Sequence, residues 1–271
     1  MLFSTDGLIT RSYDSGGSDR VIHLLTAERG RISVLVKGGK SFNGKQTACS
    51  QPFTYGNYEI YQRGDKYWMR GGSVITPFYE LSSSIVPMAL ASYLCELTDE
   101  LTDEELAGSD DAPQILRLIL NSLYAVSRKL RPYEQIKAVF ELRMAVISGY
   151  SPNLDGCSEC GKKNADMTYL DVMNGRLICS DCLEKQSGKL RIPTGVYADE
   201  MNDVNILCRA PELVPEAVRY AISAPVEKML SFRLASESQL ADFASLAETY
   251  ILNHLGRGFN SLDFYKSVKN M

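Results

Sequence analysis

The chain has 271 residues, of which 45% are hydrophobic and 23% are charged, the proportions of an ordinary globular protein. No apolar run reaches the roughly 18 residues that a membrane span needs, and the N-terminus lacks the basic and apolar regions of a signal peptide. We therefore expect a cytoplasmic protein with no membrane partner.

The charge is unevenly distributed along the chain. The net charge of −4 does not by itself indicate a nucleic-acid-binding protein. Residues 1–80 contain ten Lys or Arg and seven Asp or Glu, whereas residues 81–271 contain nineteen and twenty-six. A weakly basic N-terminal part is thus followed by an acidic remainder.

The first 80 residues alternate apolar and polar side chains as β-strands do. The predicted strands cover residues 6–13, 20–26, 31–36, 51–61 and 66–76, and a break of the last one at Gly71-Gly72 is left open. Five strands in about 80 residues predict a small closed barrel, for which the OB-fold is the commonest five-stranded candidate.

After Pro77 the apolar residues recur with a helical period. A helix opened by Pro132 is apolar nearly all round, which is typical of the centre of a bundle. The other helical stretches are residues 87–100, a short helix with a capping box at 102–105, 113–130, broken segments over 193–235, a helix capped by Ser236 and ended by Gly256, and a last turn or two at 262–265.

Two Cys-x-x-Cys pairs interrupt these helices: Cys157 with Cys160 and, after eighteen intervening residues, Cys179 with Cys182. This spacing predicts a zinc ribbon in which two knuckles flank a hairpin turning at Asn174-Gly175. Four thiolates close a tetrahedral shell, so we expect structural zinc without catalysis. The alternatives are four reduced structural thiols or two disulfides. The remaining cysteines, Cys49, Cys95 and Cys208, are expected to pack as small buried side chains.

Residues 37–45 form a Lys- and Gly-rich loop that lacks the spacing of a Walker P-loop. Either it is an arm whose lysines meet phosphates, or it is a solvated hairpin loop. Aromatic residues of the strands can stack bases on a barrel surface, but they pack in the core more often, and the sequence does not decide which ones face outward. These residues are Phe53, Tyr55, Tyr58, Tyr61, Tyr67 and Trp68.

Catalysis is not indicated by the sequence. The two histidines, His23 and His254, are far from the cysteine pairs and have no accompanying Ser or Cys motif. His23 lies within an apolar strand, so we interpret it as a hydrogen-bonded barrel residue. A zinc hydrolase or nuclease is disfavoured because four thiolates leave no open position on the metal.

The order of several short motifs resembles the RecO family of bacterial DNA repair proteins. The most specific is Gly149-Tyr-Ser-Pro-Asn-Leu154, which leads directly into Cys157-Ser-Glu-Cys-Gly161. The others are Thr26-Ala-Glu-Arg-Gly-Arg-Ile32, Val36-Lys-Gly38, Gln51-Pro-Phe53, Tyr93-Leu-Cys-Glu-Leu97, Phe140-Glu-Leu-Arg143 and Leu262-Asp-Phe264. The resemblance implies a multidomain α+β protein: an OB-fold over residues 1–80, an α-helical domain over 81–271, and a four-cysteine zinc ribbon inserted at 155–185.

The resemblance also implies a non-catalytic recombination mediator, located with the bacterial nucleoid. Such proteins bind single- and double-stranded DNA, anneal complementary strands, and help load RecA together with RecR and single-strand DNA-binding protein. The matching positions imply DNA contact by Arg31 and Lys37, with Lys40 and Lys45 just beyond. The alternative is a protein-interaction adaptor with incidental DNA contact. Because the chain is acidic, we expect weak DNA binding at cellular salt, supplemented by RecR.

Overall fold

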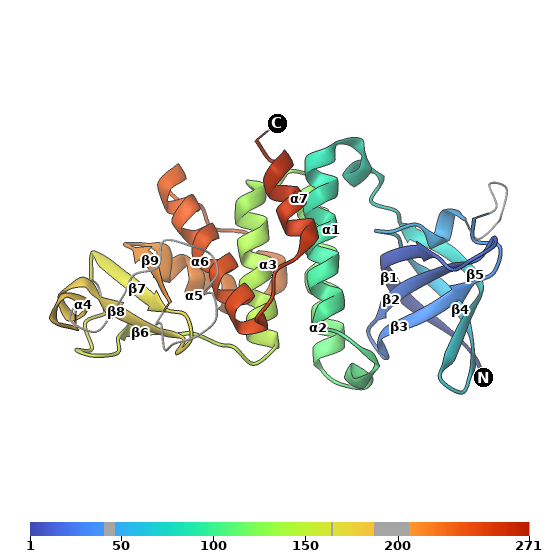
Figure 1. Ribbon diagram of the computed structural model, residues 1–271, viewed down its shortest axis with the longest axis horizontal. Coiled ribbons are helices and arrows are strands. Elements are labelled where there is room, and N and C mark those ends of the chain that lie inside the picture. Colours follow the sequence, from blue (N-terminus) through green and yellow to red (C-terminus); the bar gives the residue numbers. More distant parts are fainter. Residues whose placement is uncertain (41–46, 164, 187–205, 271) are drawn as a thin grey trace. The chain divides into compact units, whose positions relative to one another are not determined.

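The computed structural model describes residues 1–40, 47–163, 165–186 and 206–270. The chain forms two compact units (Figure 1). Unit 1 comprises Met1–Leu130 and Phe259–Met271, and unit 2 comprises Arg131–Gly258. The domain boundary expected at residue 80 and the ribbon bounds of 155–185 stay predictions. No helix within the described ranges is both long and apolar enough to cross a membrane.

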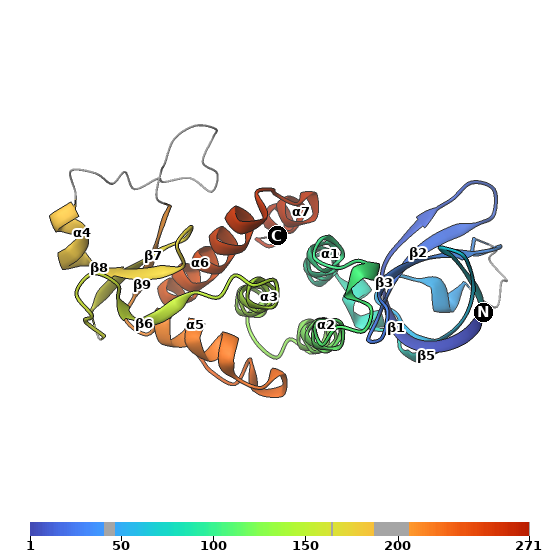
Figure 2. The same cartoon turned by 90° about the horizontal axis from the view of Figure 1, so that it is seen from below.

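Unit 1 begins with a closed five-stranded barrel whose strands follow the order β1-β2-β3-β5-β4, visible along its axis in Figure 2. The strands are β1 (Leu2–Asp14), β2 (Arg20–Thr26), β3 (Gly30–Val36), β4 (Tyr55–Arg63) and β5 (Lys66–Thr76). Alternate side chains point inward and form a core that includes Ile22, Val34, Tyr58 and Ile60. The predicted OB-like barrel is therefore confirmed.

One detail of the barrel differs from the sequence-based expectation, and a second answers a question that the sequence left open. β4 begins at Tyr55, four residues later than predicted, because Phe53 adopts a left-handed φ of 62° that a strand cannot accommodate. β5 is continuous through Gly71-Gly72. Its register against β4 shifts between Glu59 and Ile60, so Arg70 is the extra residue of a β-bulge.

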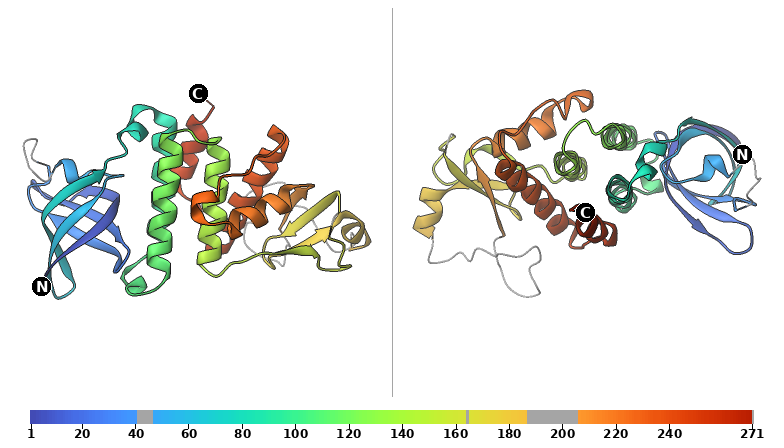
Figure 3. Two further views of the ribbon diagram at one scale, coloured as in Figure 1. Left: turned by 180° about the vertical axis from the view of Figure 1, so that it is seen from behind. Right: turned by 90° about the horizontal axis from the view of Figure 1, so that it is seen from above.

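Helices α1 (Ile85–Glu100) and α2 (Asp111–Ser127) lie beside the barrel (Figure 3), and α7 (Asn260–Val268) packs against α1 to complete unit 1. The short helix expected at 102–105 is a 3₁₀ turn over Glu104–Leu106, following a second 3₁₀ turn at Tyr79–Ser83. Its cap is Asp103, which accepts a hydrogen bond from the Glu105 backbone N–H, whereas the Thr102 hydroxyl donates to the Thr98 carbonyl. The predicted capping box is thus wrong by one residue.

The β2–β3 turn is fastened to the connection between α1 and α2. The Arg31 backbone N–H donates to the Asp103 carbonyl over 3.1 Å, and the Gly108 backbone N–H donates to the Glu28 carbonyl over 3.0 Å. Gly30 has a φ of +60°, and a Cβ there would lie 2.2 Å from the Asp103 carbonyl oxygen. Only glycine fits both the conformation and the close approach.

Unit 2 packs helices α3 (Tyr133–Ile147), α5 (Val214–Ser223) and α6 (Glu237–Leu255) with a four-stranded sheet and a short helix α4 (Ser180–Gln186). The sheet order is β6-β8-β7-β9, with β6 (Asn153–Cys157), β7 (Met167–Asp171), β8 (Arg176–Cys179) and β9 (Leu207–Pro211). β9 pairs with β7, which corrects the prediction of helical segments at that point. Residues 193–205 of that prediction lie outside the described residues.

The centre of unit 2 contains an ion cluster between α3 and α6. The Nζ atom of Lys137, whose side chain is 1% exposed, lies 3.0 Å from Glu141 Oε1 and 2.8 Å from Glu248 Oε2. Burial lowers the pKa of Lys137, but the two carboxylates outweigh burial and raise it above its ordinary value. The lysine therefore stays charged. The prediction that this helix lies at the buried centre of a bundle is confirmed, because α3 buries ten of its fifteen residues.

Candidate metal centre and nucleic-acid interface

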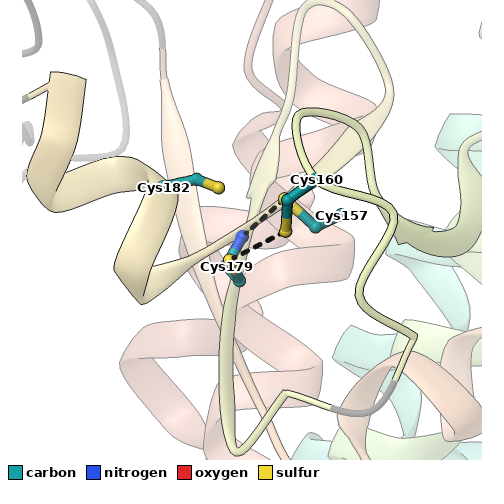
Figure 4. Close-up of side chains that lie close together, drawn as sticks. All are labelled: Cys157, Cys160, Cys179 and Cys182. Atoms are coloured by element: carbon teal, nitrogen blue, oxygen red, sulfur yellow. Dashed lines mark hydrogen bonds between the residues drawn. The ribbon is translucent and has the colours of Figure 1, made fainter.

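The four predicted metal ligands converge in unit 2 (Figure 4). Cys157 ends β6, Cys160 follows in the turn, Cys179 ends β8, and Cys182 lies in α4. Their sulfur atoms all lie within 4.8 Å of one another. All four cysteines are free, which removes the disulfide alternative.

Glycines shape the first knuckle. Gly156 has a φ of +152°, and a Cβ there would lie 3.0 Å from the Lys162 carbonyl oxygen. Gly161, which follows the first cysteine pair, has a φ of +75°, a conformation that favours glycine. The backbone closes through a 2.9 Å hydrogen bond from the Cys157 N–H to the Lys162 carbonyl. The two cysteines of the pair are therefore held in one tight turn.

The cluster fits a tetrahedral metal site. Zinc–sulfur bonds of about 2.3 Å give sulfur–sulfur edges of about 3.8 Å in a regular tetrahedron, and the Cys160 and Cys179 sulfurs lie 3.7 Å apart. Burial raises the pKa of Cys157, but backbone N–H groups, including a 3.3 Å hydrogen bond from Cys179, lower it to about 6. The residues can hold a metal ion, and four sulfurs leave no ligand position for substrate.

The outer face of the barrel carries an apolar row between two groups of cations. Leu35 of β3, Trp68 of β5, Tyr61 of β4 and Leu2 of β1 are successive register partners across the strands. Leu2 is 65% exposed, and Tyr61 and Trp68 are half-buried. Two tyrosines of the sequence-based aromatic set, Tyr58 and Tyr67, point into the core instead.

Cations flank this row on both sides. On one side of the row, Lys37 lies two residues after Leu35, and Arg70 lies two residues after Trp68. On the other side, Arg63 lies two residues after Tyr61 and is the register partner of Lys66. Each flank is therefore about 7 Å from the apolar row, since two strand residues rise about 6.6–6.8 Å. A surface cavity of about 320 Å³ is lined by Lys37, Tyr61, Arg63, Trp68, Met69 and Arg70. We call these six residues the barrel cup.

Three of these cations carry no carboxylate partner. Within the part of the chain that the structure describes, no Asp or Glu oxygen lies within 4 Å of the charged groups of Lys37, Arg63 or Lys66. All three side chains are exposed. Their charge is thus available to an anionic ligand.

Comparison with known proteins agrees with this architecture. The sequence profile described as Recombination protein O N terminal matches residues 1–78, and the profile described as Recombination protein O C terminal matches residues 82–198. The chain belongs to the RecO family. Membership places it among proteins of DNA repair and recombination.

Individual RecO relatives match over most of their length. The DNA repair protein RecO of Acetivibrio thermocellus is 26% identical over 264 residues, which cover 97% of this chain and 96% of the relative. That of Caldicellulosiruptor saccharolyticus is 26% identical over 97% of both chains. That of Bacillus pumilus is 30% identical over 190 residues, covering 70% of this chain and 72% of the relative.

The structure separates the four DNA-contact residues that the RecO resemblance implied. Lys37 lies on the rim of the barrel cup. Arg31 lies at the other end of β3, about 20 Å along the strand, and its Nε donates to the Thr102 carbonyl over 2.8 Å. The Lys40 Nζ lies 3.2 Å from Asp14 Oδ2. Lys45 lies outside the described residues. Their roles in DNA contact stay predictions.

Sequence reasoning missed Arg63, Lys66 and Arg70. Strand alternation contains the signal, because every second side chain of a strand faces the same side of the sheet. By this rule Arg63 faces the same side as Tyr61, and Lys66 and Arg70 face the same side as Trp68. The sequence does not reveal which set of alternate side chains faces outward.

His23 is a hydrogen-bonded barrel residue, as expected. Its Nδ1 lies 2.7 Å from Asp99 Oδ2, and the Thr10 hydroxyl donates to the other oxygen of that carboxylate. Among the described residues no Ser or Cys side chain joins this pair through a hydrogen bond. The arrangement fastens the barrel to α1.

Proposed function

We propose that this RecO-family chain binds DNA through the cationic outer face of its barrel and acts as a recombination mediator. In this role it binds single- and double-stranded DNA, anneals complementary strands, and helps load RecA together with RecR and single-strand DNA-binding protein. It works in the bacterial cytoplasm, at the nucleoid, and catalyses no bond-breaking step.

The observation that carries the proposal is the group of cations around the barrel cup. Lys37, Arg63 and Lys66 are exposed and lack carboxylate partners among the described residues, and Arg70 lies beside them. Exposed cations without internal partners release counterions when they neutralise phosphates, which is the main source of affinity for nucleic acid. Lys40, by contrast, already pairs with Asp14.

The number of cations sets the expected affinity. Three phosphates neutralised on a single strand, one by each of Lys37, Arg63 and Lys66, give a salt slope of about −2.1, so affinity falls about 18-fold between 50 and 200 mM salt. Binding at cellular salt is therefore weak unless a partner adds contacts. We infer that RecR supplies them. Gel-shift titrations with and without RecR test this, and tight binding by the chain alone at 200 mM salt contradicts it.

We further propose that the metal is zinc and that its role is structural. The donor set supports this, because four thiolates are typical of closed zinc sites, and zinc binding stabilises small modules by roughly 10–16 kcal/mol. When bound, the ion cross-links β6, β8 and α4. Cys157, Cys160, Cys179 and Cys182 would hold it.

Strand annealing tests the whole proposal. Complementary oligonucleotides coated with single-strand DNA-binding protein are mixed with the chain, with and without RecR, and duplex formation is followed by fluorescence. The charge-reversed variant Lys37→Glu/Arg63→Glu is expected to lose annealing. The matched control Arg11→Glu/Arg117→Glu reverses two exposed arginines that are not in the barrel cup and is expected to retain it. Unchanged annealing by the first variant instead supports a protein-interaction adaptor.

A further inference from the structure

The cations of the barrel cup do not explain the apolar row between them. Phosphate contacts need positive charge or hydrogen-bond donors, whereas the side chains of Leu35 and Leu2 offer neither, and Trp68 and Tyr61 each add one donor to a large ring. Large aromatic side chains are mostly buried in globular proteins, and here two of them line a surface cavity. A binding site for phosphates alone would not need them.

We propose that Trp68 and Tyr61 form a stacking platform for an unpaired nucleobase of single-stranded DNA. This inference rests on the proposed DNA-binding function and deepens it, because it names the part of the ligand that the apolar row receives. Stacking on an aromatic ring tolerates any base, since every base has a π-face. The platform therefore selects single strands without selecting a sequence.

The ring geometry leaves one half-buried ring accessible for stacking. The centroids of Tyr61 and Trp68 lie 5.9 Å apart with planes inclined by 41°, so the rings diverge instead of covering each other. The Arg70 guanidinium carbon lies 5.0 Å from the centre of the Tyr61 ring, a cation–π contact that occupies one face of the tyrosine. Trp68 is thus the principal ring available to a base, with Tyr61 as its side wall.

The size and charge of the cup match one extended strand. Its volume of about 320 Å³ is at the lower end of the range for small-ligand pockets, about 300–1,000 Å³. Cations on both sides, each about 7 Å from the apolar row, can meet the phosphates that precede and follow the stacked base. A base within a duplex is already stacked and paired, so a duplex meets only the cations.

The test uses the fact that Trp68 is the only tryptophan in the chain. Its fluorescence therefore reports on the cup alone. Full-length protein is titrated with oligo-dT and with an abasic strand of the same length, which has the same phosphates but no bases. We expect oligo-dT to quench Trp68 at saturation and the abasic strand to leave it unquenched, with oligo-dT binding about 5- to 150-fold more tightly per stacked base.

Variants separate stacking from packing. Trp68→Leu keeps an apolar side chain without a π-face and is expected to bind oligo-dT and the abasic strand equally. Trp68→Phe should restore part of the difference. Tyr79→Leu removes another aromatic ring of unit 1, 67% exposed and outside the cup, and should change nothing. Thermal melting confirms that each variant is folded.

The outcomes distinguish the two proposals. If Trp68→Leu retains the preference for oligo-dT while Lys37→Glu/Arg63→Glu lowers affinity for both strands, the platform is refuted and DNA binding by the barrel stands. If neither variant affects binding of either strand, both proposals fail, and the apolar row is available to a protein partner instead. Equal quenching by the abasic strand also overturns the platform.

Discussion

Neutralising Lys37 and Arg63 together should change how DNA binding depends on salt. The two side chains lie on opposite flanks of the barrel cup, and neither has a carboxylate within 4 Å among the described residues. Substituting both by glutamine removes two phosphate contacts and no internal ion pair. Stability should change little, because exposed side chains away from special features shift it by about 0.5 kcal/mol or less.

The magnitude follows from counterion release. Each phosphate contact on a single strand contributes about 0.7 to the slope of log affinity against log salt. Three contacts, from Lys37, Arg63 and Lys66, give a slope of about −2.1, and the one that remains in the variant gives about −0.7. Between 50 and 200 mM salt the unmodified chain therefore loses about 18-fold in affinity, whereas Lys37→Gln/Arg63→Gln loses about 3-fold.

Fluorescence anisotropy of a labelled oligo-dT across this salt range measures both slopes. The matched control is Arg31→Gln/Lys40→Gln, which also removes two positive charges, but from side chains bonded to Thr102 and Asp14. Its slope should equal that of the unmodified chain. An unchanged slope in Lys37→Gln/Arg63→Gln refutes the assignment of the cup. A reduced slope in the control shows that Arg31 and Lys40, which the RecO resemblance implied, contact DNA despite their bonds within the protein.

Three further predictions concern the fold. Gly30→Ala should lower the free energy of unfolding by about 2–4 kcal/mol, since it adds a steric clash to left-handed strain. Gly64→Ala, with φ +57° and nothing within 4 Å of its Cβ, adds only backbone strain and should lower the free energy of unfolding by about 1–2 kcal/mol. Equal losses of stability in denaturant titrations would refute the close contact at Gly30. Lys137→Met removes the cation that faces two carboxylates in the interior of unit 2 and should destabilise unit 2 by about 3–5 kcal/mol in urea titrations. Because the folded pKa of Lys137 is raised, its contribution is complete below pH ~10.4 and is lost as pH rises through the folded value. Cys160→Ser should reduce bound zinc in elemental analysis and expose the ribbon to proteolysis; a well-folded variant that has lost a hydrolytic activity would mean a catalytic metal.

Local patterns were sufficient for the elements whose residues specify them directly. Ser236 caps α6 by accepting from the Gln239 backbone N–H, and Gly256 ends that helix with a φ of +64°, as predicted. The spacing of the cysteines led to a cluster whose sulfurs converge. Each of these signals lies within a few neighbouring residues, so it can be recognised without knowledge of the rest of the chain.

Elements that depend on distant partners were predicted poorly. β9 has few local strand signals, and it is a strand because β7 offers it an edge for backbone hydrogen bonds. β4 starts late because Phe53 is held in a left-handed turn, where its backbone N–H donates to the Ile9 carbonyl. In both cases the partner is more than 30 residues away in sequence.

The barrel, the buried helix, the cysteine cluster and the family could all be predicted before the fold was known, because alternation, period and spacing are properties of the chain. Which cations remain available depends instead on the folded arrangement. Arg31 and Lys37 look alike in sequence, yet one donates to a backbone carbonyl and the other lines a cup with Trp68. Availability depends on what the fold brings within hydrogen-bonding distance, and closing a barrel brings together residues from four strands.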